Sequence, residues 1–181
     1  MSITNNALAS RDAHNSRLQK FFIDQLQDIY WAEQKLVKTL PKLSEAARAG
    51  ELKIAFNGHL KETRDHVTRL EKIFSIMGEP PHTRKCLAMA GIVNEGEVMI
   101  DETTDNTAER DVALIFAGQK TEHYEIATYG GLIQVAKTLG YTEVADILTQ
   151  TLTEEKEADN KLTQIAENSI NAEASEEPLE Y

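Results

Sequence analysis

Residues 18–43 read LQKFFIDQLQDIYWAEQKLVKTLPKL. The large apolar side chains of this stretch recur every three or four residues, which places them on one face of an α-helix. Glu33 lies among them, near the middle of the apolar face. The stretch therefore predicts a long amphipathic helix that carries one carboxylate on its buried side.

Three later segments repeat this pattern of an apolar helical stripe that acids or histidines interrupt near its middle. The interrupting residues are His59, Glu62 and His66 in the second segment, Glu122 and Glu125 in the third, and Glu155 and Asp159 in the fourth. No Lys or Arg lies on these stripes to pair with the acids. Because an isolated carboxylate costs several kcal/mol to remove from water, we expect a bound multivalent cation to compensate the cluster.

Capping residues and helix breakers divide the chain into four long helices. The first is expected to begin at Asn15 or Ser16 and to end near Ala49, where Gly50 stops it. Pro41 predicts a kink or a break just before it. The later helices are expected at 51–77, with Gly78 as the C-cap, at 108–138 and at 142–170, with a shorter amphipathic helix within 85–101.

Short turns join the first helix to the second and the third to the fourth, whereas residues 78–107 form a long connection between the two pairs. Two helical hairpins joined by one long crossover are typical of the ferritin-like arrangement of an all-α four-helix bundle. We therefore expect one ferritin-like bundle over residues 15–170, with the short fifth helix in the crossover. Residues 1–14 are expected to form a flexible N-terminus, and residues 171–181 a disordered acidic tail.

The interrupting residues lie at similar distances from the two hairpin turns. Glu33 and His66 are 17 and 16 residues from Gly50, and the acids of the third and fourth helices are 15–19 residues from Gly140. At a rise of about 1.5 Å per residue, these distances are roughly 20–28 Å. If the hairpins pack in register, the interrupting residues of all four helices share one layer at the middle of the bundle.

Composition excludes several classes of protein. The 19 Lys and Arg residues against 30 Asp and Glu residues leave a net charge of −11, which argues against nucleic acid or an anionic membrane as a partner. A single cysteine, Cys86, excludes an intramolecular disulfide and a zinc site built from cysteines. No apolar run approaches the roughly 20 residues of a membrane span, and the first residues show no secretory signal, so a cytoplasmic protein is expected.

The interrupting residues offer carboxylate oxygens and imidazole nitrogens, a set that suits iron or manganese and is compatible with zinc. In a ferritin-like site, single glutamates from two helices join paired ligands from the other two, and facing glutamates bridge two ions about 3.5–4 Å apart. The spacing departs from the usual Glu-x-x-His pair. The second helix offers His59-x-x-Glu62 and Glu62-x-x-x-His66, and the fourth offers Glu155-x-x-x-Asp159 without a histidine.

Four short runs carry a resemblance to a known family. They are residues 28–33 (DIYWAE), 59–63 (HLKET), 122–127 (EHYEIA) and 152–156 (LTEEK) followed by Asp159, and the crossover run 85–91 (KCLAMAG) adds to them. The chain resembles the bacterial YciE/YciF family from about residue 17 to 168. The resemblance implies a ferritin-like bundle with an added helix, a homodimer, and an association with bacterial stress responses. It implies no particular biochemical activity, because none is established for the family.

The sequence leaves three interpretations of the cluster open. In the first, the protein is a ferritin-like, dinuclear metal-binding protein of the stress response that oxidises iron or handles peroxide. In the second, the acids and histidines form a hydrogen-bond network in a metal-free structural or interaction protein. In the third, the centre binds manganese and acts as a catalase-like peroxidase. The acidic composition argues against a fourth interpretation, in which the protein is a ferritin relative that protects DNA.

Several of the candidate residues also have an ordinary structural interpretation. His59 and His66 can act as neutral hydrogen-bond partners instead of ligands. Asp159 can support a ligand without touching the metal. Tyr30 and Tyr129 fit the apolar core and can donate hydrogen bonds to the glutamates.

Overall fold

The structure, a computed structural model, describes residues 16–178 of the 181-residue chain. Its helices are α2 (Arg17–Ala46), α3 (Gly50–Met77), α4 (Leu87–Glu102), α5 (Ala108–Thr138), α6 (Thr142–Ile165) and α7 (Asn171–Glu176), and a π-helical turn, η1 (Ala166–Ile170), joins the last two. The described residues contain no strand, which confirms the predicted all-α class. None of these helices is long and apolar enough to cross a membrane.

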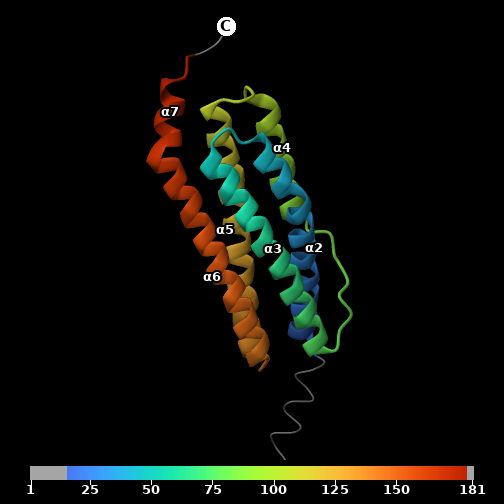
Figure 1. The fold of residues 1–181 in the computed structure, drawn as a ribbon. Helices are drawn as coiled ribbons and strands as arrows, with labels where there is room; N and C mark the ends of the chain where they lie inside the picture. The colour runs from blue at the N-terminus through green and yellow to red at the C-terminus, as the bar shows by residue number, and fades with distance from the viewer. Residues whose placement is uncertain (1–15, 179–181) are drawn as a thin grey trace, which may run out of the picture.

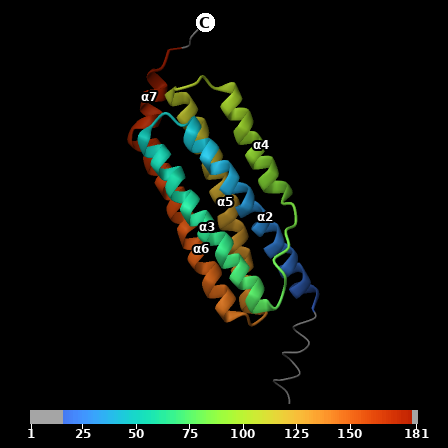
Figure 2. The same ribbon diagram turned by 45° about the vertical axis from the view of Figure 1, so that its right-hand side comes forward.

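Four long helices pack into a ring: α2 against α3, α3 against α6, α6 against α5, and α5 against α2. Helix α4 lies outside this ring, against α5 and α2, within the long connection between the hairpins (Figure 1, Figure 2). The α2–α3 turn and the α5–α6 turn lie at opposite ends of the bundle (Figure 2). The predicted topology, two hairpins joined by a crossover with a fifth helix, is confirmed.

Local sequence signals mark several of the helix ends as predicted. Ser16 caps α2, where its side chain accepts a hydrogen bond from the amide of Gln19 at 3.1 Å. Gly78 and Gly140 follow α3 and α5 with φ angles of 71° and 81°, a conformation that residues with a Cβ rarely adopt. These glycines therefore decide where α3 and α5 end.

The turn between α2 and α3 differs from the prediction. Helix α2 ends at Ala46 and Gly50 is the first residue of α3, so the prediction that Gly50 stops the first helix is wrong. The buried carboxylate of Asp111 in α5 accepts hydrogen bonds from the backbone amides of Arg48 and Ala49, at 2.7 and 2.9 Å. This contact holds the turn from 62 and 63 residues away, so a local pattern could not reveal it.

Helix α2 also continues through Pro41, so the predicted break does not occur. A proline inside a helix removes one backbone hydrogen bond and crowds the preceding turn. Here Leu40 and Leu43 are buried on either side of the proline. Because most helical stability in proteins comes from packing of the apolar face, this burial keeps the helix continuous.

The C-terminal segment is helical where the sequence predicts disorder. Helix α6 continues through η1 into α7, so the predicted disordered tail is wrong for residues 171–176. Beyond α7, the Glu177 carboxylate accepts hydrogen bonds from the amides of Ala108 and Glu109 at 2.7 and 2.9 Å. An acid at the N-terminus of α5 satisfies N–H groups that the helix leaves unpaired. The predicted flexible residues 1–14 and the last three residues lie outside the described part of the chain.

The interior of the bundle is apolar except for a small set of polar side chains. Within residues 16–178, seven buried side chains are acids or histidines: Glu33, His59, His66, Asp111, Glu122, Glu125 and Glu155. Asp111 has its backbone partners at the α2–α3 turn. The other six come from the middles of the four ring helices and form the candidate site.

Candidate metal centre

Six buried side chains, called the centre below, meet where the middles of the ring helices face one another. They are Glu33 of α2, His59 and His66 of α3, Glu122 and Glu125 of α5, and Glu155 of α6. Their ligand atoms form two groups, each with all its atoms within 4.8 Å of one another: His59, Glu122, Glu125 and Glu155 in one, and Glu33, His66 and Glu155 in the other. Glu155 belongs to both groups. A carboxylate shared in this way can bridge two metal ions.

Each histidine presents one ring nitrogen to a different oxygen of Glu155. His59 Nε2 lies 3.7 Å from Oε2 of Glu155 and 3.3 Å from Oε1 of Glu122. His66 Nδ1 lies 3.1 Å from Oε1 of Glu155 and 3.4 Å from Oε1 of Glu33. Two ligands at right angles, each about 2.1 Å from a common ion, stand about 3 Å apart. The spacing of these atoms is therefore close to that of ligands around an ion.

Most polar atoms of the centre lack a hydrogen-bond partner. Eight buried atoms have none among the described residues: Glu33 Oε2, His59 Nε2, His66 Nδ1, Glu122 Oε2, and both carboxylate oxygens of Glu125 and of Glu155. Tyr129 satisfies one other atom, because its hydroxyl donates to Oε1 of Glu33. Buried polar groups are nearly always paired, so unpaired ligand atoms gathered in one small volume favour a bound cation.

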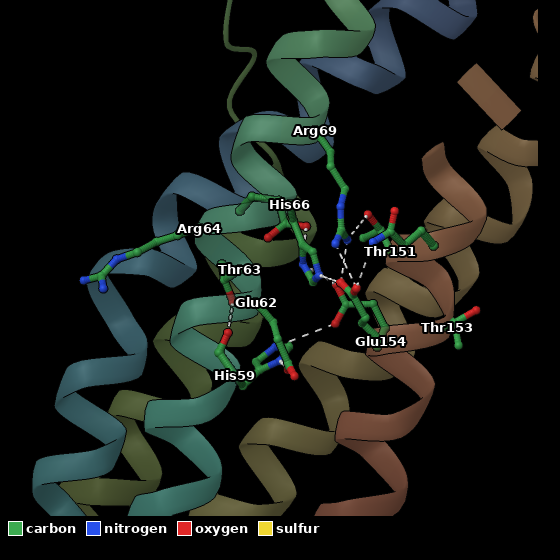
Figure 3. Close-up of polar contacts among 12 residues, drawn as sticks. His59, Glu62, Thr63, Arg64, His66, Arg69, Thr151, Thr153 and Glu154 are labelled. Carbon is green, nitrogen blue, oxygen red and sulfur yellow. Dashed lines mark hydrogen bonds and ion pairs between the residues drawn. The ribbon is translucent and has the colours of Figure 1, made fainter. Parts of the chain in front are cut away.

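Glu154 and Arg69 fix the orientation of His66 from outside the centre (Figure 3). Arg69 donates to both carboxylate oxygens of Glu154, with Nη2 2.8 Å from Oε1, and Oε2 of Glu154 lies 2.8 Å from His66 Nε2. Burial raises the pKa of Glu154, but the hydrogen bonds with Arg69 and His66, together with the charges of these two residues, lower the pKa below its usual value. An ionised Glu154 only accepts hydrogen bonds, so His66 keeps a proton on Nε2 and presents Nδ1 to the centre.

Glu62 holds His59 in a comparable way (Figure 3). Oε2 of Glu62 lies 3.3 Å from His59 Nδ1, while His59 Nε2 faces the centre. The hydrogen bond with His59 lowers the pKa of Glu62 below its usual value. The side chain of Glu62 is 48% exposed, so it lies at the edge of the centre. Histidines that bind metal commonly donate their other N–H to a carboxylate of this kind.

Without a cation, the centre favours protonated acids. Burial, followed by the neighbouring Glu155 carboxylate, raises the pKa of Glu122 and Glu125 well above the ordinary value. Burial also raises the pKa of Glu33, although contacts with His66 oppose it. Burial alone would lower the pKa of His66, but Glu155 and Glu33 raise it to about 11. Protons thus balance the charge in the metal-free protein, and a metal ion would displace them.

The structure brings together six of the eight residues that the sequence predicts as ligands, and Glu62 and Asp159 lie outside both groups. Glu62 contacts His59 from the edge of the centre. Oδ1 of Asp159 lies 3.3 Å from Nε2 of the exposed His123. The charge of Asp159 still helps to raise the pKa of Glu122. Ligation by these two residues stays a prediction.

Sequence reasoning missed Glu154 and Arg69. Arg69 follows His66 by three residues and so lies near it on the helix surface, and Glu154 directly precedes Glu155. Tyr129 donates to a glutamate of the centre, as predicted, whereas Tyr30 donates to Glu71 at 2.8 Å, outside the centre. The helical spacing could therefore have predicted that Arg69 lies near His66, whereas no pattern in the sequence pointed to Glu154.

Most of the chain is similar to known proteins. Residues 17–175 match the domain of unknown function DUF892. The chain is 42% identical over 158 residues to Protein YciF of Escherichia coli strain K12, an alignment that covers 87% of this chain and 95% of YciF. A relative this similar over nearly its whole length is expected to share the fold.

Two solved structures resemble the chain closely. The crystal structure of the E. coli stress protein YciF matches with a TM-score of 0.81 and 41% identity, over 86% of this chain and 98% of that chain. YcfI from Rhodopseudomonas palustris, whose description suggests a structural role, matches with a TM-score of 0.79 and 36% identity, over 82% of this chain and 94% of its own.

Proposed function

The chain belongs to the YciF-like DUF892 family, as its motifs predict, and we propose that this protein is a ferritin-like metal-binding protein with a dinuclear non-haem centre. The ligands would be the six residues of the centre: Glu33, His59, His66, Glu122, Glu125 and Glu155. The proposal gives a biochemical role to a family that includes a bacterial stress protein.

One observation carries the proposal: eight buried ligand atoms without a hydrogen-bond partner gather in a single layer of the bundle. Each buried polar atom that stays unpaired costs about 1–3 kcal/mol, whereas a whole domain is stable by only about 5–15 kcal/mol. Cations held between the carboxylates would remove this cost, because they would be the missing partners of these atoms.

The composition of the centre supports iron or manganese. Four carboxylates and two imidazoles are the donor set of ferritin-like di-iron and di-manganese proteins. Here both imidazoles, His59 and His66, come from α3 instead of one from each of two helices. Zinc is a weaker candidate, because its sites usually have four ligands and fewer oxygens.

A bound pair of iron or manganese ions would supply redox chemistry towards oxygen or hydrogen peroxide. The residues of this chain would set the geometry in which that chemistry occurs. Glu155 would contribute to holding both ions, because it belongs to both ligand groups. Glu154 and Glu62 orient the histidines. Tyr129 donates a hydrogen bond to Oε1 of Glu33, and Oε2 of Glu33 has no partner among the described residues.

Metal analysis of protein purified without chelators tests the proposal. We expect about two ions of iron or manganese per chain. Adding metal to the metal-free protein is expected to raise its Tm, because a ligand that binds only the folded state stabilises it. Glu155→Gln is expected to lose binding, whereas Glu167→Gln, an exposed acid of η1, retains it. Fewer than about 0.2 ions per chain, with no uptake of Fe(II) or Mn(II) and no rise in Tm, would contradict the proposal.

A metal-free hydrogen-bond network is the second candidate. The hydrogen bond of Tyr129 to Glu33 and the approach of His66 to Glu33 and Glu155 favour it. In that case Glu155→Gln leaves the Tm nearly unchanged, and added metal does not raise it. Release of O₂ from hydrogen peroxide by the manganese form would instead identify a catalase-like activity at the same centre.

A further inference from the structure

A cavity of about 210 Å³ lies between α3 and α6 and reaches the centre. Its buried side is formed by His59 and Glu122, and its exposed side by Glu62, Glu157 and Lys161. The cavity therefore connects the surface of the bundle with one of the two ligand groups. A water molecule needs about 10–15 Å³ of such space, so the cavity has room for several.

Two polar atoms on the buried side of the cavity have no partner among the described residues. They are Nε2 of His59 and Oε2 of Glu122. The side chains of these residues are only 7% and 4% exposed. Both belong to the proposed ligand set, so a molecule that passes through the cavity meets a metal ligand at its inner end.

The charge and the walls of the cavity favour a cation as its occupant. Glu62 and Glu157 against Lys161 give its exposed side a net negative charge. Such charge concentrates cations and repels anions. Gly58 leaves one wall open, because a Cβ added there would meet no heavy atom within 4 Å.

A second cavity also touches Glu122, but it is a poorer route for an ion. It lies among α2, α4 and α5, its volume is only about 30 Å³, and most of its lining side chains are apolar. A hydrated divalent cation is wider than one water molecule and keeps its waters until oxygen ligands replace them. This cavity does not have the room for such an ion.

We propose that the cavity between α3 and α6 is the passage through which hydrated divalent cations reach the centre, with Glu62 binding the ion in transit. This inference rests on the proposed function. Glu62 suits the role because its carboxylate is half exposed and contacts His59, a residue at the inner end of the cavity. An intermediate carboxylate lets the ion exchange water for protein oxygens in steps.

Filling the cavity without changing its polar residues tests the passage. Gly58→Leu places a side chain in the open space, and leucine favours a helix more than glycine does, so the fold is expected to persist. Gly91→Leu is the matched control, because Gly91 is an exposed helical glycine of α4 with no heavy atom within 4 Å of an added Cβ. Stopped-flow absorption follows Co(II) uptake by the metal-free full-length chain, and metal analysis gives the amount bound at equilibrium.

We expect Gly58→Leu to take up Co(II) at least about tenfold more slowly than the natural chain and to bind the same number of ions at equilibrium. Gly91→Leu is expected to match the natural chain in both measurements. Uptake by Gly58→Leu at the unchanged rate overturns the passage and leaves the centre intact. Failure of the natural chain itself to bind Co(II) overturns the proposed function instead.

Charge reversal on the exposed side of the cavity gives an independent measurement. At low salt, Glu157→Lys is expected to slow uptake and Lys161→Glu to accelerate it, each by about threefold or more, and high salt is expected to remove both effects. Glu62→Gln is expected to slow uptake and also to weaken binding, because Glu62 orients His59 as well. Uptake rates that respond to none of these three changes overturn the passage, whatever the behaviour of Gly58→Leu.

Discussion

The Nε2 atom of His66 lies 2.8 Å from Oε2 of Glu154, a carboxylate that stays outside the centre. Arg69 binds the same carboxylate and keeps it ionised. His66 is therefore oriented by two residues that contribute no ligand. Removal of such an orienting partner typically weakens metal binding by about 10–100-fold.

We expect Glu154→Gln to weaken metal binding by about 10–100-fold, because a neutral amide no longer fixes the proton of His66 on Nε2. Calorimetric titration of the metal-free protein measures the change. Glu167→Gln, which removes an exposed acid of η1, is the control and is expected to bind as the natural chain does. An unchanged affinity in Glu154→Gln would mean that packing alone orients His66.

Glu155 belongs to both ligand groups, whereas Glu33 belongs to only one. Glu155→Gln is therefore expected to reduce the bound metal to well below one ion per chain, and Glu33→Gln to leave about one. Metal analysis after dialysis distinguishes the two variants. Equal losses in both would contradict the assignment of Glu155 as the shared ligand.

Local patterns in the sequence were sufficient to predict the four long helices, apart from the ends of the first and last, and the layer of the centre. Apolar residues at helical spacing predict the stripe that carries Glu33 into the core, and the structure buries it. The similar distances of Glu33, His66, Glu122 and Glu155 from the hairpin turns predict that they meet, and their ligand atoms do. Both inferences need only the rise of a helix and the antiparallel packing of neighbours.

Contacts between segments that are distant in the sequence determine the features of the site and the turns that local patterns could not predict. Helix α3 carries His59, Glu62 and His66 at spacings of three and four residues, so all three lie near one face. Only the packing of α2 and α6 against α3 makes the two histidines inner residues and Glu62 an edge residue. Similarly, the hydrogen bonds from the α2–α3 turn to Asp111 and from the start of α5 to Glu177 depend on tertiary structure.

Asp111→Ala is expected to destabilise the fold by about 3 kcal/mol, because it leaves the backbone amides of Arg48 and Ala49 without a partner at a buried turn. Urea unfolding followed by circular dichroism measures the loss. Glu45→Ala, which removes an exposed acid near the end of α2, is expected to change the free energy of unfolding by less than about 0.5 kcal/mol. A similar small change in Asp111→Ala would show that water replaces the carboxylate without cost.

The metal-free protein is expected to lose stability as the pH rises above about 4.5. Burial raises the pKa of Glu122 and Glu125 above their ordinary value of 4.5, so the folded state holds protons that the unfolded chain releases. The stability from these protons is complete below pH 4.5 and is lost as the pH approaches the raised pKa values. His66 acts in the same direction, since its contribution is complete below pH 6.5 and is lost as the pH rises towards its pKa of about 11.

Bound metal is expected to remove most of this pH dependence at neutral pH, because cations replace protons as the partners of the carboxylates. Urea unfolding at several pH values between about 5 and 9, with and without Mn(II), measures both slopes. Glu125→Gln removes one titrating group and is expected to flatten the metal-free slope by up to about 1.4 kcal/mol per pH unit, whereas Glu167→Gln leaves it unchanged. A metal-free protein whose stability instead increases over this range would show that the buried acids are already ionised, and that a partner other than a proton or a metal ion balances their charge.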